Sequence, residues 1–165
     1  MIEVVAPPKR VLCLCGSLRK VSSNRAALEA ARALASMSLR LELYSGMSAL
    51  PLFNPDVEAD PLPQPVLDLR EAVGRADALL IACPEYAHGI PGAFKNLLDW
   101  LVGSIEFPAK PVLLLNTSAR GSHHAQDALQ EVLTTMSARL LSQEPLPVRL
   151  PGAGCVVDMV LGSED

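Results

Sequence analysis

The sequence has few of the features that mark secreted, metal-binding or membrane-spanning proteins. It holds four cysteines in 165 residues, too few for a disulfide framework. Its charged residues sum to a formal net charge of −4 without a block of one sign, so nothing predicts binding to nucleic acid or to a membrane surface. The N-terminus lacks a basic region followed by a long apolar segment, so we expect no signal peptide and no membrane anchor. A reducing, cytoplasmic location fits these absences.

A metal centre is also not expected. Cys13 and Cys15 would share one face of a strand, but no matching pair of cysteines or histidines supplies the remaining ligands. We therefore expect both to pack as small hydrophobic side chains. Half of the residues are hydrophobic, which suffices for one sizeable core, so residues 1–165 are predicted to form a single domain.

Strand-like and helix-like segments alternate along the chain. Apolar runs predict buried parallel strands over residues 11–15, 77–83 and 111–115, and strict alternation predicts an edge strand over 39–43. Apolar residues at helical spacing predict helices over residues 26–37, 66–75 and 92–102, and a further helix capped by Ser122. A fifth strand could lie at 140–141 or at 148–150. The pattern predicts an α/β fold, a parallel sheet wrapped by helices.

Ligands of open α/β sheets bind beyond the carboxyl ends of the strands, so the loops after the three buried strands are the candidate site. The first loop, residues 16–24, offers hydroxyls, an amide and Arg19 just before a helix, which is a donor set suited to phosphate. Its plainer interpretation is an ordinary helix cap with Arg19 in solvent. The loop has neither Gly-x-Gly-x-x-Gly nor a Walker ending, which disfavours a Rossmann dinucleotide site or a nucleotide triphosphatase.

The second loop, residues 84–92, is rich in proline and glycine and could present backbone groups and the Tyr86 ring to a flat heteroaromatic ligand. Glu85 and His88 are expected to be solvated, as lone charged groups in loops usually are. The third loop, residues 116–124, ends at a helix N-terminus, and we expect His123 and His124 to point apart there. Trp100 is expected in the core. The proline-rich stretch 51–65, with five prolines, is expected to be a loop.

At two of these loops the sequence resembles the NADPH-dependent FMN reductase family, which includes FMN-dependent quinone, azo and chromate reductases. One matching pattern is Gly16-Ser17-Leu18-Arg19-x-x-Ser22-x-Asn24. The other is Pro84-Glu85-Tyr86-x-x-x-Ile90-Pro91-Gly92-x-x-Lys95-Asn96-x-x-Asp99-Trp100. The resemblance implies a flavodoxin-like three-layer sandwich with five parallel strands in the order 2-1-3-4-5, and FMN where the strand order reverses.

The resemblance also implies which residues bind the cofactor. Ser17, Arg19, Ser22 and Asn24 would hold the FMN phosphate, and Pro84, Glu85 and Tyr86 would border the isoalloxazine ring. The full set of candidate cofactor-binding residues is Ser17, Arg19, Ser22, Ser23, Asn24, Pro84, Glu85, Tyr86, Ala87, His88, Gly89, Ser118, Arg120 and Gly121. No catalytic side chain is expected, because the flavin itself would take a hydride from NADPH or NADH and pass electrons on by a ping-pong mechanism. The acceptor would be a small molecule such as a quinone, an azo compound, a metal ion or free flavin.

Three departures from the family pattern stand in the loops. Ala87 replaces a usual Asn, Val21 replaces a common Gly, and the third loop lacks paired glycines. They keep open an alternative function, a flavodoxin-like binding or regulatory module without reductase turnover. Residues 152–165 are too short for the closing helix of the family, which predicts a thinly covered sheet face and association into a homodimer or homotetramer.

Overall fold

The apolar runs of the sequence form one parallel sheet. The computed structural model describes residues 6–59 and 61–151. Its strands are β1 (Lys9–Cys15), β2 (Leu39–Leu43), β3 (Ala78–Ala82), β4 (Pro111–Asn116), β5 (Arg139–Leu140) and β6 (Leu146–Pro147). They lie in the order β2-β1-β3-β4-β5, with β6 also paired to β4, and every pairing is parallel. The predicted flavodoxin-like order is confirmed, and the alternating segment forms the edge strand β2.

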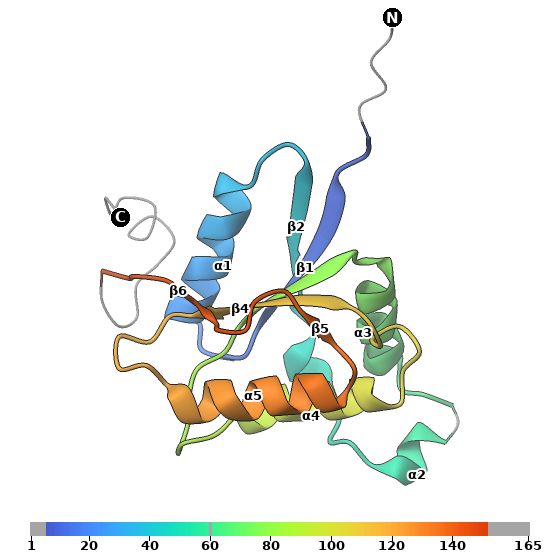
Figure 1. Cartoon of the computed structure of the whole chain (residues 1–165). Helices are drawn as coiled ribbons and strands as arrows, with labels where there is room; N and C mark the ends of the chain where they lie inside the picture. The colour runs from blue at the N-terminus through green and yellow to red at the C-terminus, as the bar shows by residue number, and fades with distance from the viewer. Residues whose placement is uncertain (1–5, 60, 152–165) are drawn as a thin grey trace, which may run out of the picture.

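Helices cover both faces of this sheet. The long helices are α1 (Ser23–Leu34), α3 (Gln64–Arg75), α4 (Gly92–Val102) and α5 (His123–Thr135). Figure 1 shows α1 on one side of the sheet and α3, α4 and α5 on the other. The larger core lies under the three helices, and the smaller one lies between α1 and the opposite face, with Val148 packed beside it. None of the helices in the described residues is long and apolar enough to cross a membrane.

The first helix begins and ends three residues earlier than its apolar spacing predicted. Ser22 is its N-cap, because the Ser22 side chain accepts a hydrogen bond from the Arg25 backbone N–H. The helix ends at Leu34, and Met37, which was predicted to be its last residue, is almost fully exposed. The N-cap therefore decided the position of the helix, and the apolar stripe did not.

The proline-rich stretch was wrongly predicted to be a loop throughout. It contains α2 (Pro55–Glu58), capped by the Asn54 side chain, and α3 begins within it at Gln64. A short 3-10 helix, η1 (Met47–Ala49), precedes the stretch. Proline is tolerated in the first turn of a helix because the N–H it lacks would have no helical partner there.

The start of the stretch, residues 51–53, is held against α4 by Asn96 and Trp100. Asn96 accepts a hydrogen bond from the Phe53 backbone N–H at 2.7 Å and donates to the Pro51 carbonyl at 2.9 Å. The Trp100 indole donates to the same carbonyl at 2.8 Å, and its ring meets Phe53 edge-on. Trp100 is fully buried, which confirms its predicted place in the core.

The fifth strand is split into two short segments. β5 and β6 pair with the beginning and the end of β4, so both predicted positions contribute, although the second segment forms at 146–147 instead of 148–150. Pro145 and Pro147 have no N–H to donate, which limits the ladder between these segments. The expectations about residues 152–165 lie outside the described residues.

Candidate functional site

Three loops meet at the carboxyl edge of the sheet. Residues 16–22, 83–91 and 117–122 follow β1, β3 and β4, which are neighbours in the sheet. The chain turns to β2 on one side of β1 and to β3 on the other, so the strand order reverses at β1. This is the position at which open α/β sheets bind ligands.

The first loop carries hydrogen-bond donors that its own structure does not use. Ser17 Oγ accepts from the Arg19 backbone N–H at 3.3 Å, and Ser22 Oγ accepts from the Arg25 N–H at 3.4 Å. The Ser17 hydroxyl still has its own hydrogen to donate, whereas the buried Ser22 hydroxyl lies 4.0 Å from Cys15 Sγ in a contact in which either atom can donate. Arg19 is exposed, and its guanidinium forms no ion pair within residues 6–59 and 61–151. Ser23 is the first residue of α1 and is half-buried.

Gly16 lets the first loop pass close to the end of β3. A Cβ at Gly16 would lie 2.7 Å from Cys83 Sγ and 3.1 Å from Cys83 Cα, so any side chain there would force the strand ends apart. Burial raises the pKa of the Cys83 thiol to about 12 and that of Cys13 to about 11. Burial likewise raises the pKa of Cys15. These thiols are therefore protonated at neutral pH and unsuited to act as nucleophiles.

The second loop closes in a tight turn from Tyr86 to Gly89. The two residues exchange backbone hydrogen bonds, with N···O distances of 3.1 and 3.0 Å. Between them Ala87 and His88 both have positive φ angles, 50° and 57°. Tyr86, Ala87 and His88 are exposed, and about half of the Tyr86 surface is accessible.

Glu85 is not a solvated carboxylate, contrary to the prediction. Its Oε2 accepts a hydrogen bond from the Ala125 backbone N–H at 2.9 Å, in the first turn of α5. Ser122 occupies the N-cap position as predicted, but it has a φ of 45° and its side chain caps nothing. Glu85 therefore does the capping from a different loop, which sequence spacing could not reveal.

The third loop is folded by its own polar side chains. Asn116 accepts from the Ser118 N–H at 3.0 Å and donates to the Gly121 carbonyl at 2.6 Å. Ser118 Oγ accepts from the Arg120 N–H at 3.2 Å, and Gly121 takes a φ of 92° that suits glycine. The Arg120 side chain is exposed and, among the described residues, in no ion pair.

A hydrogen bond joins the third loop to the first turn of α1. Thr117 Oγ1 donates to Asn24 Oδ1 at 2.9 Å, and Asn24 is buried. Thr117 was not among the residues predicted to form the site. Its place in the loop after a buried strand was the one signal available, because its partner lies 93 residues away in the chain.

The three histidines lie together, although His123 and His124 were predicted to point apart. The rings of His123 and His124 have centroids 4.0 Å apart, and His88 stacks on His124 at 4.2 Å with an interplanar angle of 24°. At the start of a helix no preceding turn restricts the side chains, so neighbouring residues can turn toward one another. No group of three or more histidine, cysteine or carboxylate side chains in the described residues could hold a metal ion.

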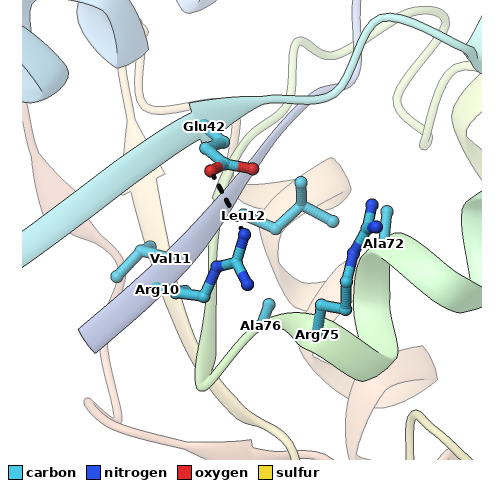
Figure 2. Close-up of a pocket in the computed structure, with 7 residues that line it drawn as sticks. All are labelled: Arg10, Val11, Leu12, Glu42, Ala72, Arg75 and Ala76. Carbon is cyan, nitrogen blue, oxygen red and sulfur yellow. Dashed lines mark ion pairs between the residues drawn. The ribbon is translucent and has the colours of Figure 1, made fainter. Parts of the chain in front are cut away.

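A hollow at the opposite edge of the sheet offers no second site. Figure 2 shows it between β1, β2 and the end of α3, with Arg10 ion-paired to Glu42 at 3.7 Å. Its other cation, Arg75, is paired with Glu71. Its volume of about 20 Å³ has room for a water molecule and not for a nucleotide.

A family model described as NADPH-dependent FMN reductase matches residues 9–146. The chain belongs to this family. It is similar to an NAD(P)H-dependent FMN reductase of Pseudomonas aeruginosa, with 38% identity over 138 residues, 81% of this chain and 74% of the relative. It is also similar to a quinone reductase of Escherichia coli, with 31% identity over 81% of this chain and 74% of the relative.

Solved structures agree with this membership. The flavoenzyme NAD(P)H:(acceptor) oxidoreductase FerB of Paracoccus denitrificans superposes with a TM-score of 0.75 at 32% identity, covering 84% of this chain and 78% of its own. An azoreductase of Bacillus anthracis has a TM-score of 0.61 at 14% identity, with 86% of each chain covered, which shows the shared fold alone. As a member of the NADPH-dependent FMN reductase family, the chain is an oxidoreductase with FMN as cofactor and NAD(P)H as electron donor.

Proposed function

We propose that FMN binds at the carboxyl edge of the sheet, with its phosphate against the first loop and its ring beside the second. The observation that carries this proposal is the donor set at the start of α1. The Ser17 hydroxyl and the Arg19 guanidinium, which is unpaired among the described residues, belong to the loop that leads into the N-terminus of α1, and Ser22 caps that helix. Phosphate oxygens are the acceptors that such a set suits.

The other candidate residues differ in whether their side chains are already hydrogen-bonded to the protein. Tyr86 offers an exposed aromatic face, and the 86–89 turn presents its outer backbone to solvent. Arg120 adds an unpaired cation from the third loop. Glu85 Oε2 accepts a hydrogen bond from α5 and Asn24 Oδ1 accepts one from the third loop, so we propose that both residues hold the loops in place and do not bind the flavin directly.

We propose a ping-pong reaction in which NAD(P)H and then a small oxidant use one open face of the site. When bound, FMN supplies the redox chemistry, accepting a hydride and passing the electrons on. The protein's part is to orient the ring, to admit flat or small molecules beside Tyr86, and to keep its buried thiols protonated and inert. A quinone, an azo compound, a metal ion or free flavin fits this description of the acceptor. A cytoplasmic location and association into a homodimer or homotetramer remain part of the proposal.

The test is an absorbance spectrum of the desalted protein with and without added FMN, followed by anaerobic NADPH. A flavin band that co-elutes with the protein and bleaches with NADPH is the expected result. A flavin band that is retained but not bleached by NADPH or NADH would support the binding or regulatory module instead. Initial rates at several fixed acceptor concentrations should give parallel double-reciprocal lines, and intersecting lines would contradict the ping-pong order.

The phosphate assignment is tested by Arg19→Ala, with Lys20→Ala as the matched control. Lys20 is the neighbouring exposed cation, so it carries the same charge without the proposed contact. A lost charge-assisted hydrogen bond should raise the Kd for FMN about tenfold or more, while the control stays within about twofold. Equal effects of the two changes would contradict the contact and indicate general electrostatic attraction.

A further inference from the structure

The turn at the tip of the second loop is held in a conformation that its residues do not favour. Ala87 and His88 follow one another with φ angles of 50° and 57°. Two successive positive φ angles are the geometry of a type I′ turn, for which asparagine and glycine are preferred. Histidine tolerates the left-handed region better than most residues, but alanine has no side-chain group to support it there. The Tyr86–Gly89 backbone hydrogen bonds close the turn, and contacts from outside it add to what favours this conformation.

The contacts that hold the turn come from the first turn of α5. His88 stacks on His124 with ring centroids 4.2 Å apart and an interplanar angle of 24°. One residue before the turn, Glu85 accepts a hydrogen bond from the Ala125 N–H at 2.9 Å. Each side of the loop is thus attached to the same end of one helix. Figure 1 shows that the beginning of α5 lies beside the loop between β3 and α4.

The stack of His88 on His124 restrains the turn and is not part of the hydrophobic core. Both imidazoles are exposed, so their contact buries little apolar surface, and neither belongs to the two hydrophobic clusters. A stack between flat rings is directional, however, and fixes where His88 can lie. Because His88 is one of the two residues with positive φ, the position of its ring restricts the backbone of the turn.

We propose that His124 is a positioning residue of this reductase. By stacking on His88, it keeps the Tyr86–Gly89 turn in the left-handed conformation that places the turn beside the flavin ring. This inference rests on the proposed function, in which that turn borders the ring. His124 itself need not touch the cofactor or the substrate.

His123 provides a matched control, and Ala87→Gly provides a way to remove the unfavourable backbone conformation at the turn. His123 is the adjacent exposed histidine on the same helical turn, and its ring contacts His124. His123→Ala therefore removes an imidazole from α5 but leaves the His88–His124 stack. Ala87→Gly removes the Cβ that disfavours positive φ. If His124 acts by holding the turn, Ala87→Gly should make the turn less dependent on His124, whereas a role in helix stability would not respond to that change.

The first experiment detects the backbone conformation of the turn in the FMN-free protein. In the NMR spectra of the FMN-free protein, residues with positive φ give a strong cross-peak between their own amide and Hα protons. We expect it for residues 87 and 88 in the wild type and in His123→Ala, and expect it to weaken in His124→Ala. Unchanged cross-peaks in His124→Ala would overturn the proposal. Thermal unfolding of each variant checks that both exposed substitutions leave the fold intact.

The second experiment measures FMN affinity by flavin fluorescence. His124→Ala should raise the Kd about three- to tenfold, in keeping with the loss of one ring stack, while His123→Ala stays within about twofold. In the Ala87→Gly background, His124→Ala should change the Kd by less than about twofold. The same loss in both backgrounds would overturn the proposal. If the wild type binds no FMN, the proposed function fails, and the NMR experiment still decides whether His124 holds the turn.

Discussion

Removal of the Glu85 carboxylate should destabilise α5 although Glu85 lies outside that helix. The carboxylate accepts the Ala125 N–H at 2.9 Å, and it is the one side chain bonded to the first backbone N–H groups of α5 within residues 6–59 and 61–151. A hydrogen bond to a charged group contributes about 1.5–3 kcal/mol, and a negative charge at a helix N-terminus contributes about 0.3–1 kcal/mol. Glu85 is partly exposed, so we expect a loss of about 2 kcal/mol in Glu85→Ala.

Glu85→Gln separates the hydrogen bond from the charge. Glutamine keeps an acceptor oxygen at nearly the same reach but removes the charge, so we expect it to lose about 1 kcal/mol. Asp127→Asn is the control, because Asp127 is an exposed carboxylate in the same helix and, among the residues that the structure describes, bonds to no backbone N–H. It should change the free energy of unfolding by less than about 0.5 kcal/mol.

Urea titration at neutral pH measures these differences without the ionic screening that guanidinium would add. The midpoints should fall in the order wild type, Glu85→Gln, Glu85→Ala, with unchanged slopes. Added salt should reduce the gap between the wild type and Glu85→Gln, because that gap is the charge contribution. An Ala variant as stable as the wild type, or a Gln variant as unstable as the Ala variant at low salt, would refute the cross-loop cap as described.

Three further predictions concern the surroundings of the site. Gly16→Ala places a Cβ 2.7 Å from Cys83 Sγ and should lower the free energy of unfolding, measured in urea, by about 1–3 kcal/mol. Adding Cys83→Ala to the same chain should recover part of this loss, because it removes the Sγ. The raised pKa values of Cys13, about 11, and Cys83, about 12, mean that the folded state binds these protons more tightly than the unfolded state. The protonated thiols stabilise the folded state fully below pH 9. Above pH 9 this stabilisation falls by about 1.4 kcal/mol per thiol and pH unit, until the pH reaches the folded-state pKa values of about 11 and 12. Urea titrations between pH 8 and 10.5 can follow the loss. Asn96→Ala leaves the Phe53 N–H without its 2.7 Å bond and should cost about 1–3 kcal/mol, seen as a lower Tm.

Most of the sheet could be predicted because its strands are local patterns. Each central strand is a continuous apolar run that has to be buried on both faces, and β2 alternates as an edge strand does. The ends of α1 were harder to predict. Ser22, Ser23 and Asn24 stand in a row as possible caps, and Ser22 and Asn24 are both buried, so only the hydrogen bond from the Arg25 N–H to Ser22 identifies the cap.

The positions of the three loops could also be predicted, but not the bonds between them. Glu85 and Ala125 are 40 residues apart, and Thr117 and Asn24 are 93 residues apart. No pattern of residue types along the chain encodes such a pairing, because it depends on how neighbouring strands set their loops side by side. The departure at Ala87 was visible in the sequence, but its meaning was not. The structure shows a positive φ at that position, which explains why asparagine is suited to it.

The bonds between the loops divide the candidate residues into two physical classes. Asn24 is bonded to the third loop and Glu85 to the start of α5, so a change at either should move the loops and reduce stability and cofactor affinity together. Arg19 and Arg120 are exposed and unpaired among the described residues, so their removal costs the fold little. An unpaired cation beside a helix N-terminus gains most from an anion that the folded protein does not itself supply. Arg19 and Arg120 are therefore available to a ligand at this edge, and both carry positive charge.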